Sequence, residues 1–328
     1  MTHSIPSGTR DVLPDEMREL RAITDALRGV FDDSGYGEVY TPALEHEEVL
    51  RTGDAAAARP AYRLFDETGQ VLVLRSDMTI PLARVVATRY AEVEPPVRLC
   101  YLQRAYRFVR PQRGEAREQL QAGVELVGAA GAEGTAEAMT VLCRALDATG
   151  LRGYSIGLGS AGLFPALLDA AGVDGDVRER LLYELLTRDF AGLAREVQVV
   201  GADERLLTVP QLRGGPEVLD AAGEAGEGLR ELHDRLPADV QERVIFDLGL
   251  LRRELGYYTG AIFEVLDPAV GMPLGGGGRY DDLLGRFGRP LPAVGWAVEV
   301  ERVHAALVGE GAGVSRPGGA PRRGRAGP

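Results

Sequence analysis

The chain has 328 residues, of which 45% are hydrophobic, and its formal net charge at pH 7 is -12. This length and composition predict a large hydrophobic core together with a smaller appended module. The negative charge disfavours a nucleic-acid partner, because phosphate backbones are repelled by it. The sequence contains no lysine, which excludes a Walker A lysine and a Schiff-base lysine.

The two cysteines and four histidines indicate neither a disulfide framework nor a metal site. Cys100 and Cys143 lie in apolar segments, as expected in the reducing cytoplasm. The histidines lack the spacing of metal ligands, and we expect no metal and no other cofactor. The N-terminal segment lacks the pattern of a signal peptide, and no apolar run approaches the ~20 residues of a membrane span. We therefore expect a cytoplasmic protein without a membrane partner.

Three elements are expected in the first quarter of the chain. Apolar residues recur at three- and four-residue steps over 15–33, which predicts a helix with one apolar stripe. Residues 39–40 should form a short strand, which Pro42 breaks. Residues 62–74 are typical of a β-hairpin with its turn at 67–69.

Asp77 stands just before a helix that is expected over residues 81–90. Thr79 is the expected N-cap of this helix, and Pro81 falls in its first turn. Two roles for Asp77 stay open. It is either a second capping carboxylate or the acceptor for the ammonium group of a ligand.

An arginine-rich loop between two expected strands, within residues 104–128, is the most informative stretch of the chain. The second strand alternates with a period of two, and its polar face carries in order Arg117, Gln119, Gln121, Gly123 and Glu125. We expect Gly123 to leave room for a ligand in the middle of this face. Together with Arg107 from the first strand, Gln121 and Glu125 supply groups that suit a small zwitterion or a nucleotide. A surface strand with one solvent-exposed polar face is the alternative.

The middle of the chain is expected to place a helical segment between strands. The expected elements follow in this order: a helix over 132–149, a strand over 153–158, a small helical insertion over about 162–237, and strands over 244–248 and 257–266. Tyr257 and Tyr258 should point to opposite sides of the last of these strands.

The C-terminal part is expected to hold one more strand and two helices. The glycine run at 275–278 indicates a flexible turn in a chain that has 43 glycines, ahead of a helix over 281–287. The last strand should reach about Val298 and lead into a helix. Residues 309–328 are rich in glycine, proline and arginine and should be disordered.

Five segments, taken together and in this order, resemble the motifs of histidyl-tRNA synthetases and of their non-catalytic paralogues, the regulatory subunits of ATP phosphoribosyltransferase. The segments are GYGEVYTPALE, LRSDMTIPLAR, YRFVRPQRGEAREQLQAGVELVG, LRRELGYYTGAIFEV, and GGGGRYDDLL with PAVGWAVEVER. The first is similar to the dimer-forming motif 1 of class II synthetases, the third to motif 2 and the last to motif 3. The resemblance extends from about Ser7 to Leu307, and the shared order makes it specific.

The resemblance implies an α+β fold, with a class II synthetase-like core of six antiparallel strands flanked by helices over residues 1–308, including the helical insertion. It implies a histidine-binding site at Asp77, Met78, Thr79, Arg107, Gln121, Glu125, Arg253, Tyr257 and Tyr258. It also implies a nucleotide site, which we expect to be vestigial, at Arg107, Arg117, Glu299 and Arg302. We expect no catalytic residue.

Several positions depart from the synthetase pattern that the resemblance implies. Val109 replaces an acidic residue of motif 2, and Glu254 and Gly256 replace the glycine and aspartate of the histidine-recognition segment. Glu299 replaces a small glycine and should face the position of ATP. A like charge at ~4 Å costs about 4 kcal/mol at an effective dielectric of about 20. We also expect no counterpart of the synthetase's anticodon-binding domain.

These departures favour a non-catalytic regulatory subunit of ATP phosphoribosyltransferase, which would act in the first step of L-histidine biosynthesis. The expected partners are a short-form catalytic subunit, a second copy of this chain, and L-histidine as effector. A truncated synthetase-like enzyme that activates histidine with ATP is the alternative, and Arg107 and Arg302 support it. A homodimeric scaffold with a vestigial site is a third hypothesis.

Overall fold

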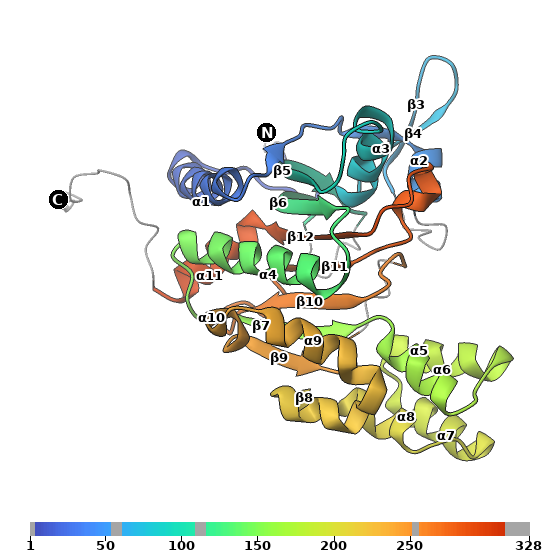
Figure 1. Ribbon diagram of the computed structural model, residues 1–328. Coiled ribbons are helices and arrows are strands. Elements are labelled where there is room, and N and C mark those ends of the chain that lie inside the picture. Colours follow the sequence, from blue (N-terminus) through green and yellow to red (C-terminus); the bar gives the residue numbers. More distant parts are fainter. Residues whose placement is uncertain (1–3, 54–60, 109–115, 251–255, 312–328) are drawn as a thin grey trace.

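A nine-stranded sheet runs through the part of the molecule that the computed structural model describes, residues 4–53, 61–108, 116–250 and 256–311. Its strand order is β1-β5-β6-β12-β11-β10-β7-β9-β8 (Figure 1). In chain order the strands are β1 (Gly37–Glu38), β5 (Val97–Tyr106), β6 (Glu118–Val127), β7 (Ser155–Ser160), β8 (Arg213–Gly214), β9 (Val244–Asp247), β10 (Ala261–Leu266), β11 (Gly275–Arg279) and β12 (Ala293–Glu299). In this spatial order, the six central strands β5, β6, β12, β11, β10 and β7 pair with one another in antiparallel fashion. This confirms the expected core of six antiparallel strands. The edges differ, because β1 and β9 pair in parallel with β5 and β7.

Three helices cover one face of the sheet (Figure 1). They are α1 (Pro14–Asp33), α4 (Gly131–Ala148) and α11 (Val300–Gly309). The apolar stripe of α1 is buried as expected, and Phe31 at its end packs against Trp296 of β12 with ring centroids 5.7 Å apart. The Trp296 indole donates a hydrogen bond to the carbonyl of Ala138 in α4 at 2.8 Å. Helices and sheet therefore share one main core on this side.

The opposite face of the sheet carries the polar alternation of β6 and is covered by shorter elements. They are α2 (Glu47–Gly53), α3 (Thr79–Arg89) and the 3-10 helix η3 (Leu284–Phe287). A second hydrophobic cluster forms here, and it includes Leu82 of α3, Leu99 of β5 and Leu284 of η3. Glu125 on this face of β6 is thus enclosed between the sheet, α3 and η3.

A second, three-stranded sheet of order β2-β4-β3 lies near α2 and α3 (Figure 1). Its strands are β2 (Leu44–His46), β3 (Arg63–Phe65) and β4 (Val71–Leu74). The expected hairpin is confirmed, and the Asp66 carboxylate accepts two backbone N–H groups within its turn. The prediction of a strand at residues 39–40 is wrong, because the strands β1 and β2 form before and after these residues. Val39 still donates its backbone N–H to the Cys100 carbonyl of β5 at 2.9 Å, and its own carbonyl accepts a hydrogen bond from the Gln103 side chain at 2.7 Å.

The segment between β7 and β9 is predominantly helical, as expected, and gathers beside the β9 edge of the sheet (Figure 1). Its helices are α5 (Leu163–Ala170), α6 (Gly175–Thr187), α7 (Phe190–Val200), α8 (Arg205–Thr208), η1 (Val209–Gln211), η2 (Pro216–Gly226), α9 (Glu227–Arg235) and α10 (Ala238–Gln241). The short strand β8 interrupts them. Arg213 of β8 pairs with Asp247 of β9, and their side chains form an ion pair at 2.7 Å.

The glycine run forms a strand, β11, and not the flexible turn that we expected. Any side chain at Gly275 or Gly277 would collide with carbonyl oxygens of β12, so glycine allows the two strands to pair closely. The helix expected over 281–287 is reduced to the short η3. The residues before η3 form a turn, in which the Asp281 carboxylate accepts the N–H of Ala293 at 3.3 Å.

The C-terminal helix α11 extends to Gly309, the first residue of the tail that we expected to be disordered. Residues 312–328 of that tail lie outside the described residues. None of the described helices is both long enough and apolar enough to cross a membrane.

Candidate functional site

Asp77 caps helix α3, which is one of the two roles that the sequence left open. Its Oδ1 atom accepts the backbone N–H of Ile80 at 3.1 Å. Thr79 is not the N-cap, because that position belongs to Met78, whose side chain makes no capping hydrogen bond. The Thr79 hydroxyl instead donates to the carboxyl group of Glu125 at 2.8 Å. A contact between Asp77 and a ligand ammonium remains a prediction.

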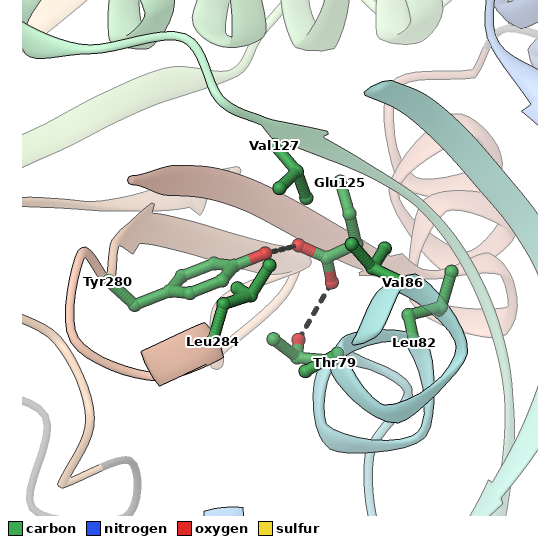
Figure 2. Close-up of a pocket in the computed structure, with 8 residues that line it drawn as sticks. Thr79, Leu82, Val86, Glu125, Val127, Tyr280 and Leu284 are labelled. Atoms are coloured by element: carbon green, nitrogen blue, oxygen red, sulfur yellow. Dashed lines mark hydrogen bonds between the residues drawn. The ribbon is translucent and has the colours of Figure 1, made fainter. Parts of the chain in front are cut away.

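Glu125 of β6 is the centre of the site, and only 2% of its surface is exposed. Thr79 and Tyr280 point toward its carboxyl group from two different directions, and each donates a hydrogen bond to one of its oxygens (Figure 2). The carboxyl group lies against Gly295 of β12, where any side chain would collide with it. Burial raises the pKa of Glu125 to about 8, against the opposing effect of the two hydrogen bonds. Glu125 is therefore predominantly a neutral acid at pH 7.

A small pocket surrounds the Glu125 carboxyl group, between α3 and the segment that leads into η3 (Figure 2). The space inside it does not admit even one water molecule, and its lining residues are Thr79, Leu82, Ala83, Val86, Glu125, Val127, Tyr280 and Leu284. Pockets for small-molecule ligands usually hold about 300–1,000 Å³. The cavity therefore offers one polar end and apolar walls, and a ligand of amino-acid size needs α3 and η3 to separate.

Three tyrosines cluster beside this pocket. Tyr257 and Tyr258 lie with ring centroids 5.0 Å apart, and Tyr257 meets Tyr280 edge-on at 5.6 Å. The prediction that the adjacent tyrosines point to opposite sides of a strand is wrong. Both residues precede β10 and lie in a turn region, where strand alternation does not apply. Sequence reasoning missed Tyr280, although it directly follows the glycine run in the GGGGRYDDLL segment.

Gly123 does not leave room for a ligand, contrary to our expectation. Tyr101 of β5 pairs with Gly123, and its phenol ring fills the space above this glycine. A Cβ atom at Gly123 would lie 2.5 Å from the Tyr101 hydroxyl oxygen. The glycine therefore accommodates a neighbouring side chain of the same protein.

Gln121 lies two positions before Gly123 on the same face of β6, and it is buried. A rise of about 3.3 Å per residue puts its Cα atom about 13 Å from that of Glu125. Gln121 is paired with Gln103 of β5 on one side and with Glu299 of β12 on the other. The polar face of β6 thus has two ends, one at Glu125 and one at Gln121, with Tyr101 between them.

Two arginines converge on the buried carboxylate of Glu299 at the Gln121 end. The Nε atom of Arg302 lies 2.5 Å from one carboxylate oxygen of Glu299, and Nη1 of Arg107 lies 3.4 Å from the other. Burial raises the pKa of Glu299, and the charges of Arg302 and Arg107 oppose this shift. Three of the four residues proposed for a vestigial nucleotide site are therefore brought together.

Arg117, the fourth of these residues, points elsewhere. Its Nε atom donates to the Ser7 carbonyl at 2.5 Å, and its Nη1 atom donates to the Tyr62 hydroxyl. The guanidinium group also lies 5.9 Å from the ring centroid of Phe108. Arg253, expected in the histidine site, and the departures Val109 and Glu254 lie outside the described residues.

No group of three or more histidine, cysteine, aspartate or glutamate side chains is arranged to hold a metal ion among the residues that the structure describes. Both cysteines are buried and free. The groups that the structure brings together at the site are the carboxyl of Glu125, the tyrosine cluster and the arginine-bound Glu299.

Comparison with known proteins shows similarity over most of the chain. The family model described as histidyl-tRNA synthetase matches residues 8–303. A protein of Symbiobacterium thermophilum named ATP phosphoribosyltransferase regulatory subunit is 40% identical over 96% of this chain and 82% of its own length. A protein of the same name from Rubrobacter xylanophilus is 38% identical over 93% of this chain and 76% of its own length.

Solved structures show the same pattern. The crystal structure described as an ATP phosphoribosyltransferase regulatory subunit/histidyl-tRNA synthetase from Bacillus halodurans has a TM-score of 0.85 and 33% identity, over 93% of this chain and 84% of that one. A histidyl-tRNA synthetase from Nostoc sp. PCC 7120 has a TM-score of 0.77 at 21% identity, over 95% of this chain and 77% of that one. The second likeness concerns the fold alone.

Proposed function

This chain belongs to the histidyl-tRNA synthetase family, and from that premise we propose that it is the regulatory subunit of an ATP phosphoribosyltransferase, acting in the first step of L-histidine biosynthesis. Relatives that carry this name are 35–40% identical over at least 91% of the chain. The observation that carries the proposal in the structure is the contrast between the two ends of the β6 polar face. The Glu125 end joins a buried carboxyl group to tyrosine rings, which supports histidine binding there, while the Glu299 end is occupied by a carboxylate.

In this function the chain is non-catalytic. Glu299 places a negative charge between Arg107 and Arg302, the two arginines that the resemblance assigns to ATP. Phosphate groups are repelled by a carboxylate at contact distance, while arginine guanidinium groups attract them. The catalytic step would be supplied by a short-form ATP phosphoribosyltransferase subunit, with which this chain forms a hetero-oligomer in the cytoplasm.

L-histidine is the effector that suits the Glu125 end. A neutral carboxyl group can donate a hydrogen bond to an imidazole nitrogen or accept one from an imidazole N–H. The tyrosine cluster of Tyr257, Tyr258 and Tyr280 supplies flat walls for the ring. Asp77 stands two residues before Thr79 of the pocket lining, and its charge acts on both Glu125 and Tyr257, so it would receive the ammonium group. Each charge-assisted hydrogen bond of this kind contributes about 1.5–3 kcal/mol.

A second copy of this chain completes the assembly. Strand register places Leu44, Leu64, Leu72 and Leu74 on one face of the three-stranded sheet. Leu44 and Leu64 remain 42% and 43% exposed in the single chain. Clustered exposed leucines on a small sheet are typical of a protein–protein interface. The preceding segment GYGEVYTPALE resembles the dimer-forming motif, which supports a homodimer through this sheet.

Reconstitution tests the regulatory function. The full chain is mixed with the short phosphoribosyltransferase of the same genome, and the mixture is examined by size-exclusion chromatography and by turnover of ATP with phosphoribosyl pyrophosphate. We expect co-elution, a higher turnover than the partner shows alone, and inhibition by histidine. Separate elution together with full turnover by the partner alone would show that the chain is not its regulatory subunit.

A synthetase-like enzyme that activates histidine is the second candidate, because Arg107 and Arg302 are both present at the Glu299 end. This activity requires histidine-dependent exchange of pyrophosphate into ATP. We expect no exchange above background with the purified chain. Robust exchange would reverse the order of the two candidates.

A further inference from the structure

The segment of residues 280–289 lies along α3 and closes the Glu125 pocket. At the N-terminal end of α3, Tyr280 and Thr79 both donate hydrogen bonds to Glu125 (Figure 2). Leu284, in the middle of the segment, is fully buried and lines the pocket together with residues of α3. A ligand that enters the pocket must therefore move this segment away from α3.

Two arginines fasten the other end of the segment to the C-terminal ends of two helices. Arg289 donates one hydrogen bond to the carbonyl of Tyr90, the C-cap of α3, and another to the carbonyl of Val93, both at 2.5 Å. Arg286 donates to the carbonyl of Gly53, the last residue of α2, at 2.6 Å. Carbonyl groups at a helix C-terminus lack partners within the helix and lie at the negative end of its dipole, so guanidinium groups are favourable partners for them.

The hydrogen bonds at the two ends of the segment differ in what a ligand can replace. Ligand groups that bind Glu125 can take the places of the Thr79 and Tyr280 hydroxyls, because a carboxyl group has both donor and acceptor capacity. Neither Arg286 nor Arg289 lines the pocket, so a ligand cannot replace the carbonyls that these arginines lose when the segment moves. The arginine contacts therefore oppose opening in the bound state as well as in the free one.

We propose that Arg286 and Arg289 form a latch that holds the segment against α2 and α3, and that its release opens the Glu125 pocket to a small ligand. The two arginines are positioning residues, which determine how often the pocket is open without touching the ligand. That this ligand is L-histidine rests on the function proposed above. A site that is open for a fraction of the time has an apparent affinity reduced by that fraction, so a weaker latch should tighten binding. General damage to the fold would weaken it.

Thiol modification measures the opening without any ligand. Val86→Cys places a thiol in the pocket wall, at a position that is 1% exposed, with little change in side-chain volume. In this background we expect Arg286→Ala and Arg289→Ala to raise the rate of its modification by iodoacetamide at least about five-fold, because the rate follows the open fraction. Cys143, which is buried in the main core, is the internal reference for global unfolding and should react at its original rate.

Two further variants separate a latch from the general effect of losing an arginine. Arg152 donates to the carbonyls of Asp147 and Leu151 near the C-terminal end of α4, on the other face of the sheet. Arg152→Ala removes a comparable contact and should leave the rate at the pocket thiol unchanged. Arg289→Lys keeps the charge but offers one ammonium group in place of a fork of donors, and should give an intermediate rate. If the alanine variants do not fold, Arg289→Lys decides the test.

Calorimetry with L-histidine tests the consequence for binding. We expect Arg289→Ala, without the introduced thiol, to bind at least about three-fold more tightly than the unmodified chain, and Arg152→Ala to bind like it. Unchanged thiol rates in the latch variants, an equal rise in Arg152→Ala, or an equal rise at Cys143 would overturn the latch. Faster modification with unchanged histidine affinity would refute its control of binding. If histidine binds to no variant, the histidine function fails, and the thiol rates still decide whether the latch exists.

Discussion

The protonation state of Glu125 links the site to the stability of the fold. Its pKa lies near 8 in the folded chain because burial disfavours the charged carboxylate. In the unfolded chain a glutamate has a pKa of about 4.3. Between these two values the folded state holds a proton that the unfolded state has released, so unfolding releases that proton and becomes easier as the pH rises.

We predict that this carboxyl group makes the protein less stable from pH 5 to pH 8. The contribution of Glu125 to the free energy of unfolding is greatest below about pH 4.3. Above that pH it falls by about 1.4 kcal/mol per pH unit until the pH exceeds the pKa of Glu125 in the folded chain. Glu125→Gln should flatten this part of the profile, because an amide does not titrate. Urea unfolding at several pH values measures the slope. Glu48→Gln, at an exposed position on α2, should keep the original slope. A profile that is equally steep in Glu125→Gln would assign the dependence to other groups.

The glycine against which Glu125 packs should tolerate no side chain. Gly295→Ala places a methyl group into the Glu125 carboxyl group, and we predict a loss of more than about 2 kcal/mol in the free energy of unfolding. Gly29→Ala is the matched control, because nothing lies within 4 Å of a Cβ atom there and the position is exposed in the middle of α1. It should stabilise the chain by about 1 kcal/mol. Denaturant midpoints compare the two variants, and equal shifts would refute close packing at Gly295.

At the scale of single elements, the small sheet carries the predicted homodimer. Leu64→Asp puts a charge on the leucine face, at edge strand β3, and burying an unpaired charge at an interface costs several kcal/mol. We predict that this variant sediments as a monomer at concentrations where the unmodified chain is a dimer. Val199→Asp makes the same kind of change at an exposed valine of α7 and should leave sedimentation unchanged. A Leu64→Asp dimer would place the interface on another surface.

Elements that depend on local pattern could be predicted from the sequence. The stripe of α1 and the hairpin around residues 66–70 follow from spacing and turn chemistry within a few residues. The polar and apolar faces of β6 follow from period two alone. The glycine strand β11 could not be predicted in this way, because its glycines are required by close pairing with β12, which lies about twenty residues later in the chain.

Contacts between residues far apart in the chain could not be predicted inside the candidate site either. The residues of β6 that face the site could be predicted because they share one strand. The side chains that fill that site come from strand β5 and from the residue that follows β11, and their positions depend on how the strands pair. Tyr101 covers Gly123, and Tyr280 reaches Glu125 from a turn 155 residues away in sequence. The sequence showed where a polar face exists, but not that the protein's own tyrosines occupy it.

At the scale of the whole molecule, helix α3 connects the Glu125 pocket to the leucine face. Thr79 and Leu82 of α3 line the pocket, and Arg84 of the same helix forms an ion pair at 2.8 Å with the buried Glu45 of β2. A ligand that separates α3 from η3 must therefore shift the helix to which the small sheet is bound. Such a shift couples effector binding to the assembly only if the two arrangements bind the effector unequally.

The predicted coupling can be measured in the reconstituted complex. Glu125→Ala removes the polar end of the pocket, and the histidine concentration for half-inhibition should rise at least about ten-fold, within the roughly 5- to 150-fold range of typical allosteric coupling. Co-elution with the partner should persist, because Glu125 is enclosed within the chain and does not reach the leucine face. Glu48→Gln should retain the original sensitivity. If Glu125→Ala is inhibited at the same histidine concentration, the effector binds elsewhere, and the neutral carboxyl of Glu125 then serves only to join β6, α3 and Tyr280.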